Sequence, residues 1–150
     1  MPNYPDELNT RKAEKAVSFY HQKMSSYTLY HNGKEVILPV NENYILVGIN
    51  NPKTIKSTAM RQYTSFSKRI NDSDTSVKIY IVSLLKNIEK KTINGIPIYS
   101  YKSEALGAYF KISDTRNFVL FVNSINEIEF FDYYLLPVNE INLLIEGIIK

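Results

Sequence analysis

The sequence predicts a single α+β domain over residues 1–150, in which a mainly antiparallel twisted sheet carries N-terminal, middle and C-terminal helices. Three observations predict this class. The chain has 150 residues, of which 44% are hydrophobic, a usual size and composition for one folded domain. Apolar segments with strand-like patterns outnumber those with helical spacing. Most links between successive predicted strands are short, and short links join antiparallel neighbours, with a small barrel as the alternative.

The first half of the chain shows a local signal for each element. Pro5 and the acidic residues after it suit the first turn of a helix. Asn32-Gly33 accepts the positive φ angles of a two-residue turn and therefore predicts a β-hairpin. A nearly continuous apolar run predicts an interior strand, and helical spacing of apolar residues follows the break at 50–52. The predicted elements are a helix over 5–24, strands over 27–31, 34–38 and 44–49, and a helix over 55–70.

The second half predicts a series of strands followed by one helix. The segment from Val77 is rich in β-branched residues, which favour strands. Pro97 places the next strand at a sheet edge or at its own start, after a turn at Asn94-Gly95. Pro137 ends the last strand, and Asn139 is a suitable N-cap for a final helix. The predicted strands cover 77–85, 96–101, 108–112, 118–123 and 128–136.

Composition excludes several kinds of site. The sequence has no cysteine, so it carries no disulfide, no zinc–cysteine site, no iron–sulfur cluster and no thiol nucleophile. No apolar run approaches the ~20 residues that span a bilayer, and residues 1–7 lack the features of a signal peptide. We therefore expect a cytoplasmic protein. The bias toward Lys, Asn and Tyr indicates a low-GC genome and fits a phage, plasmid or other mobile element.

The charge distribution suggests a function. Residues 1–91 hold 14 Lys and Arg and 8 Asp and Glu, a net +6, whereas residues 92–150 hold 4 and 7, a net −3. From Asn50 to Asn71 there are five basic residues and no acid. Cations and hydroxyl groups are what phosphate contacts require. The predicted basic face consists of Lys53, Ser57, Arg61, Thr64 and Lys68, with Lys56 and Arg69 at its sides.

The leading functional prediction is a small non-enzymatic binding protein that contacts nucleic acid, either DNA or RNA, through this basic helix face. Low sequence specificity is expected because lysine lacks the bidentate geometry of arginine. No cofactor is expected. The competing interpretation is that the face is only the solvated side of a packed helix.

Two alternative functions are kept beside the leading one. A protein-interaction or inhibitor module would bind a host protein through aromatic residues of the acidic C-terminal third. The charge asymmetry between the two halves would also fit self-association into a homo-oligomer. A Mg²⁺-dependent nuclease would hold the metal with acids and position water with a lysine. The residues for the interaction surface are Phe130, Phe131, Tyr133 and Tyr134, and those for the nuclease are Asp72, Asp74, Glu89 and Lys91.

Overall fold

The computed structural model describes residues 22–73, 75–85, 91–102, 116–133 and 136–149. Their strands form one sheet of eight strands in the order β2-β1-β6-β4-β3-β7-β8, with β5 paired to β6 beside this path. The strands are β1 (Tyr27–His31), β2 (Lys34–Leu38), β3 (Asn43–Gly48), β4 (Val77–Ser83), β5 (Thr92–Ile93), β6 (Ile96–Ser100), β7 (Phe118–Val122) and β8 (Ile128–Asp132). The helices are α2 (Pro52–Ile55), α3 (Thr58–Asn71) and α5 (Val138–Ile149).

The sheet is mixed, so the prediction of a mainly antiparallel sheet is wrong. β4 runs parallel to β3 on one side and to β6 on the other, at the centre of the sheet. Antiparallel pairs join β7 to β3 and β8, and β1 to β2 and β6. The reason lies in the connections. The long segment 49–76, which contains α2 and α3, lets the chain return in the same direction, as parallel pairing requires.

The local turn signals are confirmed. β1 and β2 pair in full register from Tyr27↔Leu38 to His31↔Lys34 around Asn32-Gly33, whose φ angles are 49° and 80°. Asn94-Gly95 makes a second turn of this kind, with φ angles of 52° and 79°, between β5 and β6. β3 is interior as predicted, because it lies between β4 and β7. Residues 5–21 of the predicted N-terminal helix and the predicted strand over 108–112 lie outside the described residues. The last part of that predicted helix, residues 22–24, is not helical, because Lys23 forms an antiparallel bridge with Glu127.

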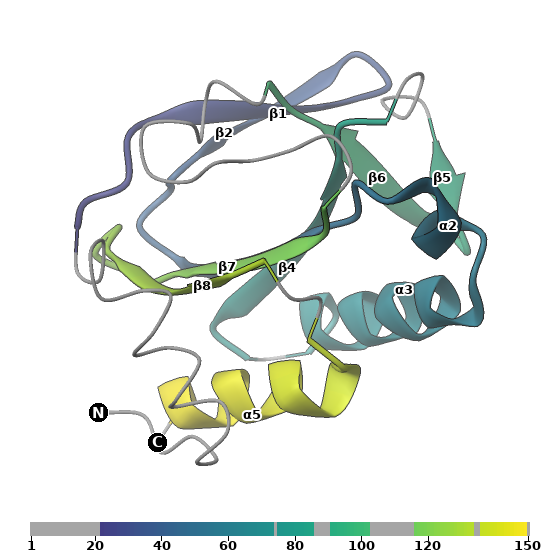
Figure 1. Cartoon of the computed structure of the whole chain (residues 1–150). Coiled ribbons are helices and arrows are strands. Elements are labelled where there is room, and N and C mark those ends of the chain that lie inside the picture. Colours follow the sequence, from purple (N-terminus) through teal and green to yellow (C-terminus); the bar gives the residue numbers. More distant parts are fainter. Residues whose placement is uncertain (1–21, 74, 86–90, 103–115, 134–135, 150) are drawn as a thin grey trace.

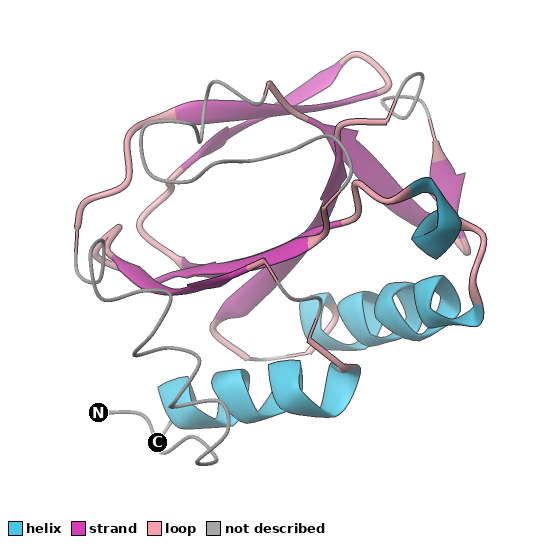
Figure 2. Ribbon diagram, viewed as in Figure 1, coloured by secondary structure: helices cyan, strands magenta, loops and turns pink. Residues whose placement is uncertain are grey.

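Helices α3 and α5 cover the same face of the sheet (Figures 1 and 2). The apolar stripe of α3, with Tyr63 and Phe66 at its middle, packs with Ile141 and Leu144 of α5 over strands β3, β4 and β7. The predicted helix over 55–70 is therefore found, although it starts at Thr58 after a short separate turn, α2, with Pro52 at its first position. Within the described residues, no helix has the length and apolar character needed to cross a membrane.

The opposite face of the sheet has its own core, and the sheet curls around it (Figure 1). Tyr27 of β1 donates a hydrogen bond to Tyr44 of β3, with 2.9 Å between the hydroxyl oxygens, although β6 and β4 lie between these strands in the sheet. Phe118 and Phe131 fill the other side of this core. Both faces are therefore apolar, and polar chemistry is left to the ends of the strands.

Candidate functional site

The carboxyl ends of the parallel strands β3 and β4 form the most organised polar site in the described residues. From β3 the chain crosses through α2 and α3 to β4 on one side, whereas β7 lies on the other side of β3. Such a switch point between neighbouring strands is where open α/β sheets bind their ligands, just outside the carboxyl ends. The segments that meet here are 49–54 after β3, 84–85 after β4 and 116–117 before β7.

Asn50 is the centre of this site. Its side chain is fully buried, and its amide nitrogen donates to the Tyr101 hydroxyl at 3.0 Å and to the Arg116 carbonyl oxygen at 3.1 Å. Its amide oxygen accepts from the Leu84 backbone nitrogen at 2.9 Å. A buried polar group is tolerated when it is hydrogen-bonded in this way. Asn50 therefore ties together the chain segments that follow β4 and β6 and that precede β7.

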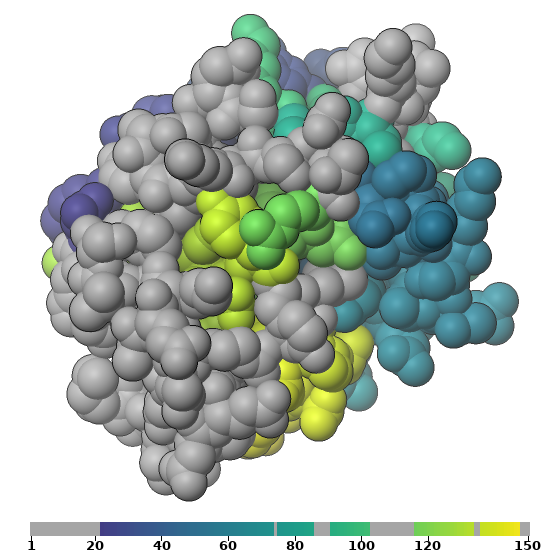
Figure 3. All heavy atoms as spheres, in the orientation of Figure 1, coloured from purple at the N-terminus to yellow at the C-terminus, as the bar shows by residue number. Residues whose placement is uncertain are grey.

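Asn117 continues the network toward α2. Its amide oxygen accepts from the backbone nitrogens of Asn50 and Asn51, at 2.9 and 3.0 Å. Its amide nitrogen donates to Thr54 Oγ1 at 3.0 Å. The Asn51 side chain caps α2 by accepting from the Lys53 backbone nitrogen at 3.0 Å. Through these bonds α2 is held against the start of β7, and the two segments lie next to each other at the surface (Figure 3).

The interior of the site is neutral and its rim is cationic. Burial raises the pKa of Tyr101 more than the hydrogen bond with Asn50 lowers it, so the hydroxyl keeps its proton near neutral pH. The charged side chains of α2 and its C-cap, of the start of α3 and of the segment 116–117 before β7 are all exposed and all basic: Lys53, Lys56, Arg61 and Arg116. Such a site can bind hydrogen-bonding and anionic groups, and it offers no thiol.

The predicted basic face of α3 is not continuous. Thr64, predicted as an exposed phosphate donor, is fully buried: its hydroxyl bonds the Met60 carbonyl oxygen at 3.0 Å and accepts from Asn94 at 3.1 Å. The turn between β5 and β6 covers this side of the helix. Lys68 pairs with Asp72 at 3.1 Å, and the Arg69 guanidinium lies 5.1 Å from the centre of the Phe66 ring.

The remaining predicted basic residues lie together at the junction of α2 and α3. Lys53, Lys56, Ser57 and Arg61 are exposed there. A cavity of about 240 Å³ opens between this junction and the β5–β6 turn, and Lys56, Ser57 and Arg61 are among its lining residues.

The predicted nuclease residues are not brought together as a site. Asp72 is the C-cap of α3 and is paired with Lys68, and Lys91 is exposed before β5. Asp74 and Glu89 lie outside the described residues. In the part of the chain that the structure describes, no group of three or more His, Asp or Glu side chains could hold a metal ion.

The predicted interaction surface in the C-terminal third is also wrong for its two phenylalanines. Phe130 and Phe131 are 0% and 1% exposed, and they belong to the cores on opposite faces of the sheet. Tyr133 is half-buried, and Tyr134 lies outside the described residues. Phe130 and Phe131 therefore build the fold, because β8 is covered on both faces of the sheet.

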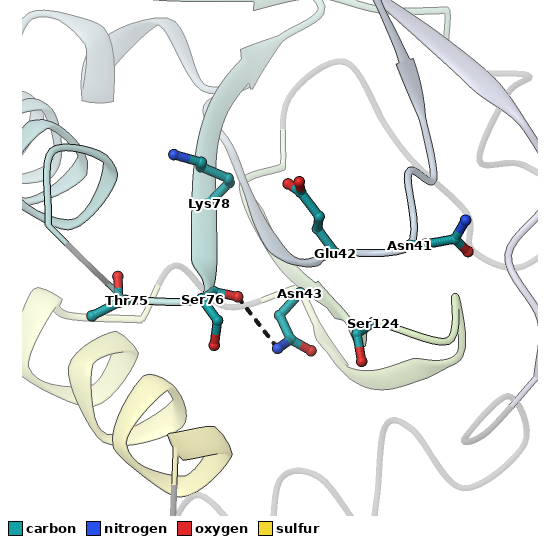
Figure 4. A pocket seen from close by; sticks show the side chains of 7 residues that line it. All are labelled: Asn41, Glu42, Asn43, Thr75, Ser76, Lys78 and Ser124. Carbon is teal, nitrogen blue, oxygen red and sulfur yellow. Dashed lines mark hydrogen bonds between the residues drawn. The ribbon is translucent and has the colours of Figure 1, made fainter.

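A polar cavity of about 430 Å³ lies at the other end of the parallel strands (Figure 4). It is open, and the Asn43 side chain spans part of it by donating to the Ser76 carbonyl oxygen at 3.3 Å. Glu42 and Lys78 give it one charge of each sign, so it has no net preference for an anion or a cation. Its lining residues are Asn41, Glu42, Asn43, Thr75, Ser76, Lys78 and Ser124.

Comparison with known proteins identifies the fold. No family model and no curated protein sequence matches the chain. The thioredoxin domain of a thiol-disulfide oxidoreductase from Bacteroides vulgatus matches with a TM-score of 0.65 at 12% identity, over 87% of this chain and 98% of that chain. An exposed lipoprotein thioredoxin from Streptococcus pneumoniae matches with a TM-score of 0.59 at 12% identity, over 81% and 98%. A peroxiredoxin-like protein from Aquifex aeolicus gives 0.57 at 11%, over 83% and 86%.

These likenesses show a thioredoxin-like fold, and they overturn the predicted function. The structures that share the fold are named as thioredoxins, thiol-disulfide oxidoreductases and peroxiredoxin-like proteins, which are redox proteins and not nucleic-acid-binding proteins. The nucleic-acid-binding prediction is therefore wrong. These neighbours also lend no support to the nuclease alternative or to an origin in a phage, plasmid or other mobile element.

Sequence reasoning missed Asn50, Tyr101 and Asn117. One signal pointed toward their position: a continuously apolar strand is typical of a parallel sheet, and here it is followed by Asn-Asn-Pro and a helix. That pattern places residues 50–52 at the carboxyl end of a parallel strand, where a site is expected. Nothing local marks Asn117, which reaches the site only through the pairing of β7 with β3.

Proposed function

We propose that this protein is a non-catalytic thioredoxin-like binding module, which holds an acidic polypeptide segment of a protein partner at the carboxyl ends of β3 and β4. One observation carries the proposal: four exposed cations lie on the segments that the Asn50–Asn117 amide network joins at the switch point of the sheet and on the helix that follows. They are Lys53, Lys56, Arg61 and Arg116. The network fixes the backbone that carries the cations. Positive charge held on a fixed scaffold favours an anionic partner.

A binding role, and not disulfide exchange, follows from the chemistry of the side chains. The solved structures with this fold include thiol-disulfide oxidoreductases. Exchange begins with the attack of a thiolate on a disulfide sulfur, and this sequence has no cysteine to supply one. The amides and hydroxyls of the site stabilise the fold and bind polar groups, but they do not replace a thiolate. We keep the cytoplasm as the proposed location, since a chain without cysteine needs no oxidising compartment.

The spread of the cations favours a polypeptide over a small anion. Lys53 is on α2, Lys56 follows it, Arg61 is near the start of α3 and Arg116 precedes β7. A small anion would contact one or two of these groups, whereas a segment with several carboxylates can pair with most of them. Because Asn50 is buried and its amide is already bonded, the exposed cations make the first contact.

Fluorescence anisotropy with a labelled peptide tests this function. The probe is a fluorescein-labelled decapeptide of alternating Glu and Ser, and the matched probe replaces each Glu by Gln. At low salt we expect binding of the Glu peptide only. The double variant Lys53→Ser/Lys56→Ser should weaken it by about 2- to 30-fold, since each exposed ion pair contributes about 0.2–1 kcal/mol.

The control removes the same charge elsewhere. Lys68→Ser/Lys78→Ser changes two exposed lysines, one paired with Asp72 and one beside the polar cavity at the other end of the sheet. This variant should bind the Glu peptide as the wild type does. No binding of the Glu peptide by the wild type, or an equal loss in both double variants, would contradict the proposal.

Reduction of insulin by dithiothreitol separates binding from exchange. The protein should leave the rate of insulin precipitation unchanged, because it has no thiol to relay electrons. A thioredoxin assayed in parallel shows that the conditions detect catalysis. Acceleration by this protein would mean that exchange does occur and would refute the non-catalytic role.

A further inference from the structure

We infer that Arg116 is the residue that sets the specificity of this site, and that it takes one carboxylate of the bound segment in a two-point hydrogen bond. The inference rests on the proposed function and adds to it which residue recognises the partner and through which group. Arg116 differs from the other exposed cations of the rim in how firmly both its side chain and its backbone are held.

The side chain of Arg116 rests on an aromatic ring. Its guanidinium carbon lies 4.4 Å from the centre of the Tyr133 ring, within the range of a cation–π contact. This contact acts through the charge of the guanidinium and the electrons of the ring. An arginine placed in this way is limited in the directions in which it can present its planar fork.

The ring under Arg116 is itself fixed by the core. Tyr133 meets Phe131 edge to face at 4.8 Å, Phe131 stacks on Phe118 at 5.7 Å, and Phe118 meets Tyr101 at 6.1 Å. Phe118 and Phe131 are buried, and Tyr101 is bonded to Asn50. An unbroken series of side chains therefore links the surface cation to the buried amide at the centre of the site. Rings packed in this way have little freedom to move.

The backbone of Arg116 is held at the same place. Its carbonyl oxygen accepts from the Asn50 amide, and the next residue, Asn117, is bonded to the backbone that begins α2. Binding costs less entropy when the binding group is already in position. Lys53 and Lys56, by contrast, carry their charge on exposed flexible stems. They attract an anionic segment without fixing where any one carboxylate lies.

The chemistry of the guanidinium determines what Arg116 selects. Its planar fork matches the two oxygens of a carboxylate, and such paired hydrogen bonds are stronger and more directional than a single ammonium contact. A lysine at this position would keep the charge and lose the fork. The proposed ligand group is a Glu or Asp side chain of the partner, within a segment that the lysines of the rim draw in.

Charge-conserving variants test the inference with the labelled Glu–Ser decapeptide. Arg116→Lys should weaken binding by about tenfold, because hydrogen bonds between charged groups are worth at least that factor. The matched control is Arg69→Lys, which changes an exposed arginine of α3 that lies outside the rim and also rests on an aromatic ring, that of Phe66. It should stay within about twofold of the wild type. Unchanged circular dichroism and melting temperatures show that both variants fold.

Variants at the supporting ring test the geometry. Tyr133→Phe keeps the ring and should bind as the wild type does. Tyr133→Leu removes it and should weaken binding in the wild type but not further in Arg116→Lys, since coupled residues are not additive.

The outcomes separate the inference from the proposed function. If Arg116→Lys equals the wild type while Lys53→Ser/Lys56→Ser binds less well, the inference fails and the proposed function stands. If the wild-type protein does not bind the Glu–Ser peptide at all, the proposed function itself fails.

Discussion

Asn50 shows how much one buried amide can organise. Its side chain serves the Leu84 nitrogen, the Arg116 carbonyl and the Tyr101 hydroxyl at once. In Asn50→Leu, which has a similar volume, the two backbone groups and the hydroxyl lose their partner inside the protein. Each unsatisfied buried group costs about 1–3 kcal/mol, so we expect the free energy of unfolding to fall by at least about 3 kcal/mol.

Urea denaturation measures this loss, and Tyr101→Phe is the matched control. That variant removes one hydroxyl and leaves the bonds of Asn50 to Leu84 and Arg116 in place, so it should cost clearly less. Similar losses in the two variants would mean that the Tyr101 hydroxyl, and not the amide, carries the network.

Gly48 is required for a different reason, the close approach of an aromatic ring. A Cβ atom at this position would overlap the ring of Phe118, which pairs with it in the neighbouring strand and is fully buried. Gly48→Ala should therefore destabilise the protein by about 1–3 kcal/mol, the usual cost of overpacking a core. Thermal unfolding measures the effect. Gly48→Ala/Phe118→Leu relieves the overlap, so the alanine should cost less in that background, and an equal cost would disprove the steric explanation.

Residues of this kind are hard to find in the sequence. Asparagine occupies 15 of the 150 positions, so neither Asn50 nor Asn117 stands out by type. The residues that do stand out are the lysines and arginines of 53–69. The helical spacing that groups them on one face contains no information about which neighbouring elements cover that face. Thr64 belonged to the predicted exposed face, yet the β5–β6 turn buries it. Residue type predicts charge reliably, but it does not predict what covers a side chain.

At the scale of elements, Asn71 joins helix α3 to strand β4. Its amide nitrogen donates to the Ile79 carbonyl oxygen at 2.9 Å, and its amide oxygen accepts from the Ile79 nitrogen at 2.8 Å. The side chain thus binds both backbone groups of one strand residue, as a neighbouring strand would. β6 pairs with residues 81–83 of β4, so the amide occupies a stretch of this edge that none of the described strands covers.

Asn71→Leu should consequently loosen the end of α3. Two backbone groups of Ile79 lose their partner, and we expect a loss of about 2–4 kcal/mol in the free energy of unfolding. Hydrogen exchange at the Ile79 amide should also become faster, which is a direct readout of the missing bond. Asn142→Leu is the control, because the bond of the Asn142 amide to Glu146 stays within one helix. Equal protection of Ile79 in both variants would contradict this role.

Elements were predictable where their cause is local. The hairpin over 27–38 follows from Asn32-Gly33, and the interior position of β3 follows from its apolar run. The direction of strand pairing was not predictable from short links alone. The crossover 49–76 is long and helical, and a connection of this kind is typical of a parallel pair. The pairing of β4 with β6 joins two strands that do not follow each other in the chain, and no local pattern specifies it.

At the scale of the whole molecule, buried tyrosines link stability to alkaline pH. Burial raises the pKa of Tyr27, Tyr44 and Tyr101 above the ordinary value of about 10. Above that pH the unfolded chain releases phenolic protons that the folded chain still holds. The free energy of unfolding should therefore be constant near pH 8 and fall above about pH 10, by up to about 1.4 kcal/mol per pH unit for each tyrosine.

Urea titrations between pH 8 and pH 11 measure this slope, and Tyr44→Phe identifies its source. The variant retains the ring and removes one titrating group, so its slope should be smaller than that of the wild type. Lysines titrate in the same range, but they are common to both proteins. An unchanged slope in Tyr44→Phe would mean that the loss of stability arises from groups other than this tyrosine.

The pairing of β3 with β7 also has a consequence for how the chain is made. Gly48 pairs with Phe118 about seventy positions later, so the ribosome releases β3 long before its partner exists. Until β7 emerges, one edge of β3 has no strand to pair with. The core inside the curled sheet also lacks Leu120, which β7 contributes. Such an open apolar edge favours association between nascent chains. Closing so long a loop also makes this pairing a slow step of folding, which cannot be completed before the last third of the chain is synthesised.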